Sequence, residues 1–375
     1  MNKGRCVRFL DLAVTDRSER ATLINKLDDI LIRGQLVLGP EVAEFETSTA
    51  LYCGRKYSIG VGSGTDALIL SIKAMQFPPG SEIITTPLSW VASVNAIVLN
   101  GLIPVFADID ETLTINCSTI ERLISKKTVG ILAVDFAGQP SDYLRLKQIC
   151  DAYSLTLIQD ASQAFGARDV LGHCGKHGEI SAVSHNSMKT LASFGEAGSV
   201  LTDNEELAER VKMLRYAGTI NREDCVTPSY NSRMDTIQAA FLLHRLKSLD
   251  KVIEKRNSLA RIYIENLPRE IGLPVIASNT IQHGYYTFQI FSERRDELQN
   301  MLKLRGIETK VQHRLLIPQH RYYQGNFRGT FPLGREVVRK SLCIPCSEKL
   351  STDDQGYVLE MISECCRELK MDNVR

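Results

Sequence analysis

Between about residues 55 and 205, short runs of apolar and β-branched residues alternate with longer stretches in which apolar positions recur every three or four residues. The short runs have the length of strands, and the longer stretches have the period of an amphipathic helix. Such alternation predicts an α/β fold with a mostly parallel sheet covered by helices on both faces. The predicted strands span 56–61, 82–86, 103–108, 129–134, 156–160, 180–184 and 198–202. Clear helical stretches span 66–75, 91–99 and 144–153.

The pattern changes in the last third of the chain. Residues 235–267 predict one long helix, kinked or straight, that leads into a second domain. Its apolar stripe belongs to core packing and consists of Ile237, Phe241, Leu246, Leu249 and Ile253. The elements expected after it are a strand at 285–291, a helix at 295–306 closed by Gly306, and a last helix at 352–369 with Thr352 as its N-cap.

Length and composition narrow the class of protein. The chain has 375 residues, enough for two domains, and we expect a large domain over 1–248 and a smaller α+β domain over 249–375. A net charge of +1 without lysine- or arginine-rich runs argues against a nucleic-acid partner. The first residues lack the apolar core of a signal peptide, and no apolar run could span a bilayer. We therefore expect a cytoplasmic protein that does not bind membranes.

The ten cysteines are scattered along the sequence. In a cytosolic chain we expect them to be free and mostly buried. Cys343 and Cys346 form a CxxC pair, but no second pair of ligands accompanies them, so the sequence predicts no metal site.

Three polar residues near predicted strand ends supply the groups that a pyridoxal phosphate site needs. Lys189 offers an amine for the cofactor aldehyde, Asp160 a carboxylate for the pyridine nitrogen, and Ser184 a hydroxyl for the phosphate. Taken singly, each residue has an ordinary explanation, since an aspartate is common at a strand end and most lysines are solvated. Ligands of parallel sheets bind beyond the carboxyl ends of the strands, where Asp160 and Ser184 are expected.

The glycine-rich stretch G-V-G-S-G-T-D-A-L at 60–68 follows a predicted strand and opens a helix. Such a loop suits an anion, because its backbone can approach the ligand and a helix N-terminus favours negative charge. A nicotinamide-dependent oxidoreductase is the rival interpretation, but Thr65 stands where the dinucleotide fingerprint needs a final Gly or Ala. Trp90, the only tryptophan, follows another strand and could either cover a flat ring or simply pack.

In this order, the motifs closely resemble those of the DegT/DnrJ/EryC1/StrS family of pyridoxal-phosphate-dependent sugar aminotransferases, over nearly the whole chain. The matching segments are F-L-D-L (9–12), R-G-Q-L-V-L-G-P-E-V-A-E-F-E (33–46), G-S-G-T-D-A-L (62–68), P-V-F-A-D-I-D (104–110), D-F-A-G-Q-P (135–140), Q-D-A-S-Q-A-F-G-A (159–167), G-E-A-G-S-V (195–200), Y-N-S-R-M-D-T-I-Q-A-A (230–240) and L-K-L-R-G-I-E-T (302–309). The resemblance implies fold type I of these transferases, with a seven-stranded sheet in the large domain.

Roles for individual residues follow from the resemblance. Lys189 would bond the cofactor and carry protons, Asp160 would pair with the pyridine nitrogen, and Gln163 would bond the ring oxygen. Trp90 occupies the position that stacks on the ring. The residues that would hold the phosphate are Gly64, Thr65 and Ser184. Asn231 matches an asparagine that reaches the phosphate of the neighbouring subunit, which implies a homodimer with shared active sites.

The implied substrates are an amino-acid donor, L-glutamate, and a nucleotide-linked keto sugar, whose amino product enters surface polysaccharides or secondary metabolites. Arg233 and His313 match positions that line the sugar-nucleotide pocket, and N-S-R-M-D at 231–235 resembles members that act at C-3. A sugar dehydratase of this family carries His in place of Lys189, and a non-catalytic regulatory relative would bind the cofactor without converting it. The sequence departs from the family pattern at several positions, namely His185 for Phe, Ser187 for Pro, G-E-A-G at 195–198 for the frequent G-E-G-G, and Arg314 for Tyr. The last is expected near the substrate.

Overall fold

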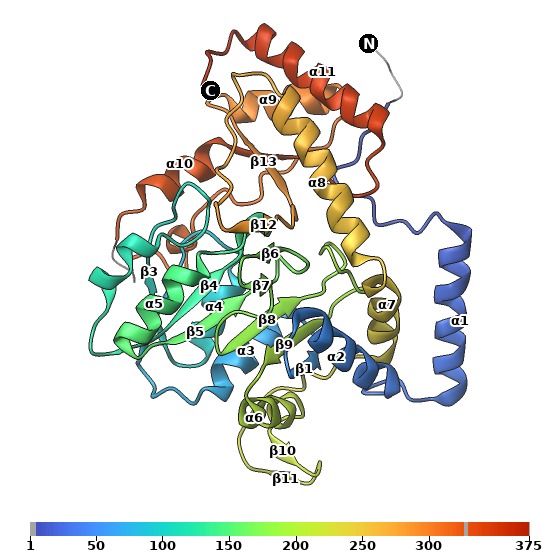
Figure 1. Cartoon of the computed structure of the whole chain (residues 1–375), viewed down its shortest axis with the longest axis vertical. Helices are drawn as coiled ribbons and strands as arrows, with labels where there is room; N and C mark the ends of the chain where they lie inside the picture. Colours follow the sequence, from blue (N-terminus) through green and yellow to red (C-terminus); the bar gives the residue numbers. More distant parts are fainter. Residues whose placement is uncertain (1–4, 326–328, 375) are drawn as a thin grey trace.

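The computed structural model describes residues 5–325 and 329–374, so the first four residues of the predicted large domain lie outside it. A seven-stranded sheet forms its centre (Figure 1). The strands are β1 (Tyr57–Val61), β2 (Glu82–Thr85), β3 (Ile103–Phe106), β4 (Thr128–Val134), β5 (Thr156–Asp160), β8 (Ile180–Ser184) and β9 (Gly198–Thr202). Their order is β1-β9-β8-β5-β4-β2-β3, and β9 runs antiparallel to the other six strands, which share one direction. The seven predicted strands are these seven, which confirms the expected α/β sheet.

Eleven α-helices lie in the described residues and cover or extend this sheet. They are α1 (Arg17–Arg33), α2 (Pro40–Cys53), α3 (Gly64–Ala74), α4 (Ala92–Leu99), α5 (Tyr143–Tyr153), α6 (Glu205–Arg215), α7 (Thr236–Leu246), α8 (Leu249–Asn266), α9 (Arg295–Leu304), α10 (Pro332–Lys340) and α11 (Thr352–Leu369). Short 3-10 helices span Cys117–Thr119, Glu121–Leu123, Phe136–Gly138 and Ile317–Gln319.

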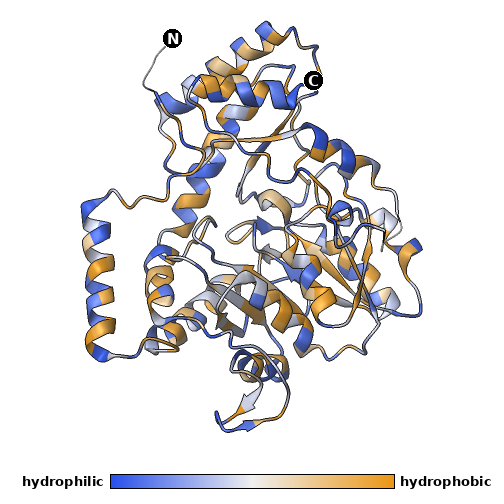
Figure 2. Cartoon of the chain, turned by 180° about the vertical axis from the view of Figure 1, so that it is seen from behind, coloured by the Kyte–Doolittle hydropathy of each residue, from blue (hydrophilic) through white to orange (hydrophobic). Residues whose placement is uncertain are grey.

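Both faces of the sheet are buried. Neighbouring residues of a strand point to opposite faces, so Ile158 of β5 packs with α3, α4 and α6, whereas Leu157 packs with α5. In β9, Val200 joins the first face and Leu201 packs on the other with α2 and α7. This double burial explains why the strands appear in the sequence as nearly continuous apolar runs rather than alternating ones. Viewed from behind, the strands are largely hydrophobic (Figure 2).

Two details of the helix prediction are wrong. The long helix expected at 235–267 is divided into α7 and α8, because the chain turns at Lys247 and Ser248. The Ser248 hydroxyl donates to the carbonyl of Arg245 at 3.1 Å and so satisfies a group at the end of α7. The last helix is capped by Ser351 rather than Thr352, since the Ser351 hydroxyl accepts from Asp354 N at 3.0 Å.

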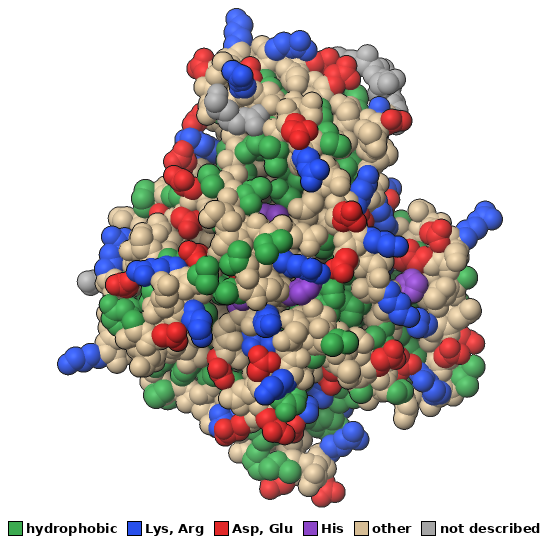
Figure 3. All heavy atoms as spheres, viewed as in Figure 1, with side chains coloured by type: hydrophobic (Ala, Val, Ile, Leu, Met, Phe, Trp, Pro, Cys, Tyr) green, Lys and Arg blue, Asp and Glu red, His purple; other side chains and the backbone are tan. Residues whose placement is uncertain are grey.

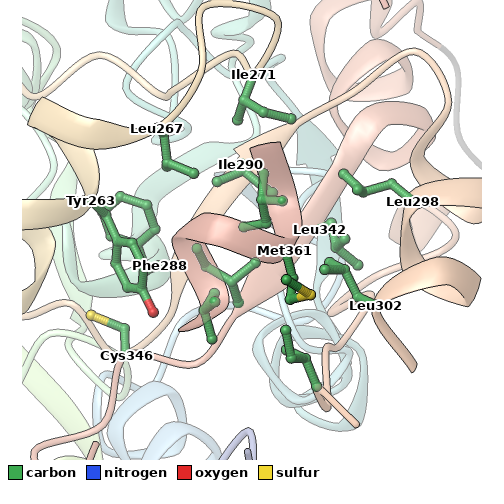
Figure 4. Packing of buried hydrophobic residues seen from close by; sticks show 14 of the residues in the cluster. Tyr263, Leu267, Ile271, Phe288, Ile290, Leu298, Leu302, Leu342, Cys346 and Met361 are labelled. Atoms are coloured by element: carbon green, nitrogen blue, oxygen red, sulfur yellow. The ribbon is translucent and has the colours of Figure 1, made fainter. Parts of the chain in front are cut away.

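The C-terminal part has a packed core of its own, in which Tyr263, Phe288, Leu298 and Leu342 lie together (Figure 4). Helix α8 belongs to both parts, because its first turns pack with α2 and α7 while Leu259 and later residues join the C-terminal core. The division at residue 248 stays a prediction. The expected strand at 285–291 begins only at Phe288, in β13 (Phe288–Phe291), which pairs with β14 (Ser341–Ile344).

Peripheral elements complete the fold. Helix α1 packs against α7 at one edge, and a hairpin of β10 (Thr219–Ile220) and β11 (Asp224–Cys225) projects at the end opposite the two termini (Figure 1). A three-stranded sheet joins β12 (Thr280–Gln282), β6 (Arg168–Asp169) and β7 (Gly172–His173).

The surface carries charges of both signs (Figure 3), and most cysteines are buried. Acidic and basic side chains are mixed over the face seen in Figure 3. No helix of the described part is both long and apolar enough to cross a membrane. All ten cysteines are free, and only Cys6 and Cys225 are exposed, as predicted. Burial raises the pKa of both Cys343 and Cys346 to about 12, and the described residues contain no metal-binding cluster.

Candidate active site

Eight of the ten predicted site residues line one cavity of about 440 Å³, a volume within the usual range for small-molecule sites. They are Gly64, Thr65, Trp90, Asp160, Gln163, Ser184, Lys189 and His313. The cavity opens beyond the carboxyl ends of β5 and β8, because Asp160 and Ser184 are the last residues of these strands. Residues from the C-terminal part close its other side.

Asp160 is the buried acid of the cavity, with 4% of its surface exposed. The Ser93 hydroxyl donates to its Oδ2 at 2.8 Å, and Ser162 N donates to its Oδ1 at 3.1 Å. Ser89 and Ser93 are in turn joined by their hydroxyls at 2.8 Å. A buried carboxylate held in this way keeps a fixed direction and can pair with a cationic group of a ligand.

The start of α3 lies directly against the end of β8. Ser63 caps the helix by accepting from Asp66 N at 3.0 Å, and Gly64 is the first helical residue. A Cβ on Gly64 would lie 2.4 Å from Cβ of Ser184, so no larger residue fits there. The close packing brings the Ser184 hydroxyl beside the N-terminus of α3, where backbone N–H groups favour an anion.

Lys189 lies in the turn that follows β8, where its N–H donates to the carbonyl of Asn186 at 2.8 Å. Its Nζ is 4.4 Å from the centre of the Tyr286 ring. Burial lowers the pKa of Lys189 to about 8, against the opposing attraction of Asp160, and the positive charge of Lys310 adds to the decrease. The amine is therefore far easier to deprotonate than an ordinary lysine.

Gln163, Trp90 and His313 form the remaining walls. Oε1 of Gln163 accepts from Ala137 N at 2.9 Å and from Nε2 of Gln312 at 3.1 Å. Trp90 is 63% exposed, so its ring is available to a ligand. Burial lowers the pKa of His313 to about 4, and its buried Nε2 has no hydrogen-bond partner among the described residues.

Asn231 and Arg233 do not line this cavity. With Tyr216 they form a separate group, here named the Tyr216 cluster. Arg233 donates from Nε to Oδ1 of Asn231 at 2.7 Å and from a terminal nitrogen to the Tyr216 hydroxyl at 3.1 Å. Its guanidinium lies 4.6 Å from the centre of the Tyr216 ring. The roles that the resemblance gives these two residues therefore stay predictions.

The structure also places three of the departures from the family pattern, His185, Ser187 and Arg314. His185 is buried between Phe45 and Phe165, with both ring centroids 5.4 Å away, and burial lowers its pKa to about 3. Ser187 contributes its N–H to the carbonyl of Gly195 at 2.9 Å. Arg314 is not part of the cavity wall and bonds Asp296 and Gln299 of α9, so its expected place near the substrate stays a prediction.

The sequence reasoning missed several residues of the cavity. Those with a polar or charged group facing it include Ser93, Glu196, Tyr286, Lys310 and Gln312. Ser93 and Gln312 lie close in sequence to two residues that the reasoning did select, Trp90 and His313. This closeness in sequence was the one signal that could have identified them. Nothing in the sequence near Tyr286 points to the cavity.

Comparison with known proteins extends to nearly the whole chain. A family model described as the DegT/DnrJ/EryC1/StrS aminotransferase family matches residues 17–363. The dTDP-3-amino-3,4,6-trideoxy-alpha-D-glucose transaminase of Streptomyces venezuelae is 34% identical over 363 residues, covering 96% of each chain. The Pleiotropic regulatory protein of Geobacillus stearothermophilus is 32% identical over 368 residues, covering 96% of this chain and 99% of the relative.

Solved structures agree with the sequence comparison. The crystal structure of S. venezuelae DesV in complex with a ketimine intermediate superposes with a TM-score of 0.92 at 34% identity, covering 96% of this chain and 98% of DesV. This chain therefore belongs to the DegT/DnrJ/EryC1/StrS family of pyridoxal-phosphate-dependent sugar aminotransferases.

Proposed function

We propose that this chain transfers an amino group from L-glutamate to a keto group at C-3 of a nucleotide-linked sugar. The observation that carries the proposal is the meeting of Lys189 and Asp160 in one cavity, with the pKa of the amine lowered to about 8. The printed name of the S. venezuelae relative, a transaminase for a dTDP-linked 3-amino sugar, supports the substrate class and the position. The product would serve surface polysaccharide or secondary-metabolite synthesis.

The cavity residues fit pyridoxal phosphate. The glycine at position 64 keeps the N-terminus of α3 and the Ser184 hydroxyl close enough to share one phosphate. Asp160 is buried and firmly hydrogen-bonded, as a partner of a protonated pyridine nitrogen should be. Gln163 would bond the ring oxygen, Thr65 would add a hydroxyl at the phosphate, and the exposed face of Trp90 would cover the ring.

When bound, the protonated ring of the cofactor withdraws electrons from the carbon that loses a proton. Lys189 would hold the cofactor and then carry the proton between Cα of the donor and C4′ of the cofactor. Since its pKa is about 8, a useful fraction of its amine is neutral near pH 7 and can accept that proton. Asp160 would keep the pyridine nitrogen protonated, because a buried carboxylate stabilises the positive charge.

The same proposal includes a homodimer with shared active sites. Asn231 and Arg233 stand outside the cavity of their own chain, so they can act on a ligand only at another surface. Helix α1 exposes Ile24, Leu31 and Ile32, which suits an apolar contact with a second subunit. His313 would then meet the sugar nucleotide from one subunit and Arg233 from the other.

A regulatory protein that binds the cofactor without turnover is the second candidate. It is favoured by the name of the G. stearothermophilus relative, which is nearly as similar to this chain as the transaminase is. A sugar dehydratase is disfavoured, because such members carry His where this chain has Lys189.

The first experiment is an absorbance spectrum of the purified protein before and after L-glutamate is added. Transamination predicts a visible cofactor band that glutamate bleaches, followed by its return when a nucleotide-linked 3-keto sugar is supplied. A band that ignores glutamate and other amino acids would favour the regulatory candidate. A protein that cannot take up added pyridoxal phosphate would contradict both.

A further inference from the structure

A directional chain of hydrogen bonds connects the C-terminal part with the cavity. The Ser341 hydroxyl donates to Oε1 of Gln289 at 3.0 Å, and Nε2 of Gln289 donates to Oε1 of Gln312 at 3.3 Å. Nε2 of Gln312 then donates to Oε1 of Gln163 at 3.1 Å. Gln289 and Gln312 thus each accept from the preceding residue and donate to the next one, and Gln163 accepts at the cavity end of the chain.

The direction of this chain is fixed at its cavity end, because the backbone N–H of Ala137 can only donate and holds Oε1 of Gln163 as an acceptor, whereas the hydroxyls of Ser341 and Thr287 can donate or accept. The Thr287 hydroxyl at 3.0 Å and Sγ of Cys343 at 3.8 Å also donate to Oε1 of Gln312, so three donors hold that oxygen. A reversed Gln312 amide would turn its N–H₂ group towards the N–H₂ group of Gln289 and its oxygen towards Oε1 of Gln163. Such a reversal would leave buried polar groups unsatisfied, which is costly in an interior where Gln289 is only 3% exposed.

The consequence appears at Gln163. Its oxygen accepts from both Gln312 and Ala137 N, so the acceptor end of the amide is fully occupied by the protein. The donor end, Nε2, is then the part of this amide that can serve a ligand in the cavity. Ala137 alone would favour this orientation, and Gln312 adds the second donor that secures it.

We propose that Gln312 is a positioning residue that makes Gln163 present an N–H group, and not a carbonyl, to the ring oxygen of bound pyridoxal phosphate. The proposal rests on the proposed function, because it requires the cofactor in this cavity. An inverted Gln163 would place its oxygen against the electron-rich ring oxygen, which weakens binding and changes the proton affinity of that oxygen. Gln312 itself would act only through Gln163.

The test is a cycle of three variants, Gln312→Met, Gln163→Met and the double variant, in apo-protein titrated with pyridoxal phosphate. Methionine keeps the side-chain length and removes both polar groups. We expect Gln312→Met to weaken cofactor binding about 3- to 10-fold, the effect of one hydrogen bond, and to shift the pH dependence of the cofactor absorbance. In the Gln163→Met background, Gln312→Met should change neither quantity further.

Thr287→Val supplies a second approach if Gln312→Met folds poorly, because it leaves Gln312 in place and removes one of the three donors to its oxygen. We expect Thr287→Val to weaken cofactor binding and shift the absorbance titration in the same direction as Gln312→Met, but by less, and to have no effect in the Gln163→Met background.

Gln148→Met on the exposed face of α5 is the matched control and should change neither cofactor binding nor the absorbance titration. Additive effects of Gln312 and Gln163, or an unchanged absorbance titration in Gln312→Met, would overturn the inference. Wild-type protein that takes up no cofactor would instead contradict the proposed function.

Discussion

The cavity and the Tyr216 cluster differ in how complete they are within one chain. The cavity gathers an acid, an amine, a helix N-terminus and a flat ring, each held by neighbours of the same subunit. The Tyr216 cluster has an asparagine, a guanidinium and an aromatic ring, but no cavity of its own chain reaches Asn231 or Arg233 among those described. One chain thus supplies most of the groups proposed for the cofactor, whereas Asn231 and Arg233 could act on a ligand only at another surface.

The largest expected effect tests the cavity. Replacing the amine in Lys189→Ala should reduce turnover by at least about 10²–10⁴-fold, the contribution of a positioned acid–base group, while the protein still folds. Steady-state assay with L-glutamate and a keto-sugar acceptor measures the loss. Lys176→Ala, at an exposed position, is the control and should retain activity. Multiple turnover by Lys189→Ala at a rate near that of the wild type would reject Lys189 as the catalytic amine.

The next effect tests the Tyr216 cluster directly. Asn231→Ala should be weakly active alone, and co-refolding it with inactive Lys189→Ala should restore activity. If sites are shared, a statistical mixture of dimers regains about a quarter of the wild-type sites, because each mixed dimer has one intact site. Assays of the mixture against each variant alone provide the measurement. No recovery in a mixture shown to contain mixed dimers would mean that Asn231 serves its own chain or none.

The smallest effect sharpens the electrostatics of the cavity. Lys310→Met removes a positive charge that lowers the pKa of Lys189, so that pKa should rise above about 8. Only the neutral amine attacks the cofactor aldehyde. The pH at which the apo-protein begins to take up the cofactor rapidly should therefore be higher in Lys310→Met than in the wild type. Rates of cofactor uptake measured across pH 6–10 would show this; Lys303→Met on the exposed side of α9 is the control. A shift to lower pH would contradict this assignment of the charge.

Sequence reasoning succeeded where local pattern and topology decide the outcome. The seven strands were recognisable because burial on both faces makes them apolar throughout. Asp160 and Ser184 could be placed together because the carboxyl ends of parallel strands meet at one edge. The glycine-rich start of α3 added a signal with a direct physical meaning, which the close approach of Gly64 to Ser184 supports.

The rest depended on packing between distant segments. Gln312 bonds Gln163 across 149 positions of sequence, and no periodicity or turn signal announces such a contact. Tyr286 is brought beside Lys189 only by the docking of the C-terminal part on the sheet. The break between α7 and α8 has neither Gly nor Pro at Lys247 and Ser248, so helix propensity alone could not reveal it.

The imidazole of His185, enclosed by Phe45 and Phe165, has a further consequence for the response of this fold to acid. In the unfolded chain it would take up a proton below about pH 6.5, but in the folded protein only near pH 3. Between these values the unfolded state binds more protons, so the free energy of unfolding falls as the pH falls. A residue that does not line the cavity thereby contributes an acid limit to the range of pH in which the cavity exists.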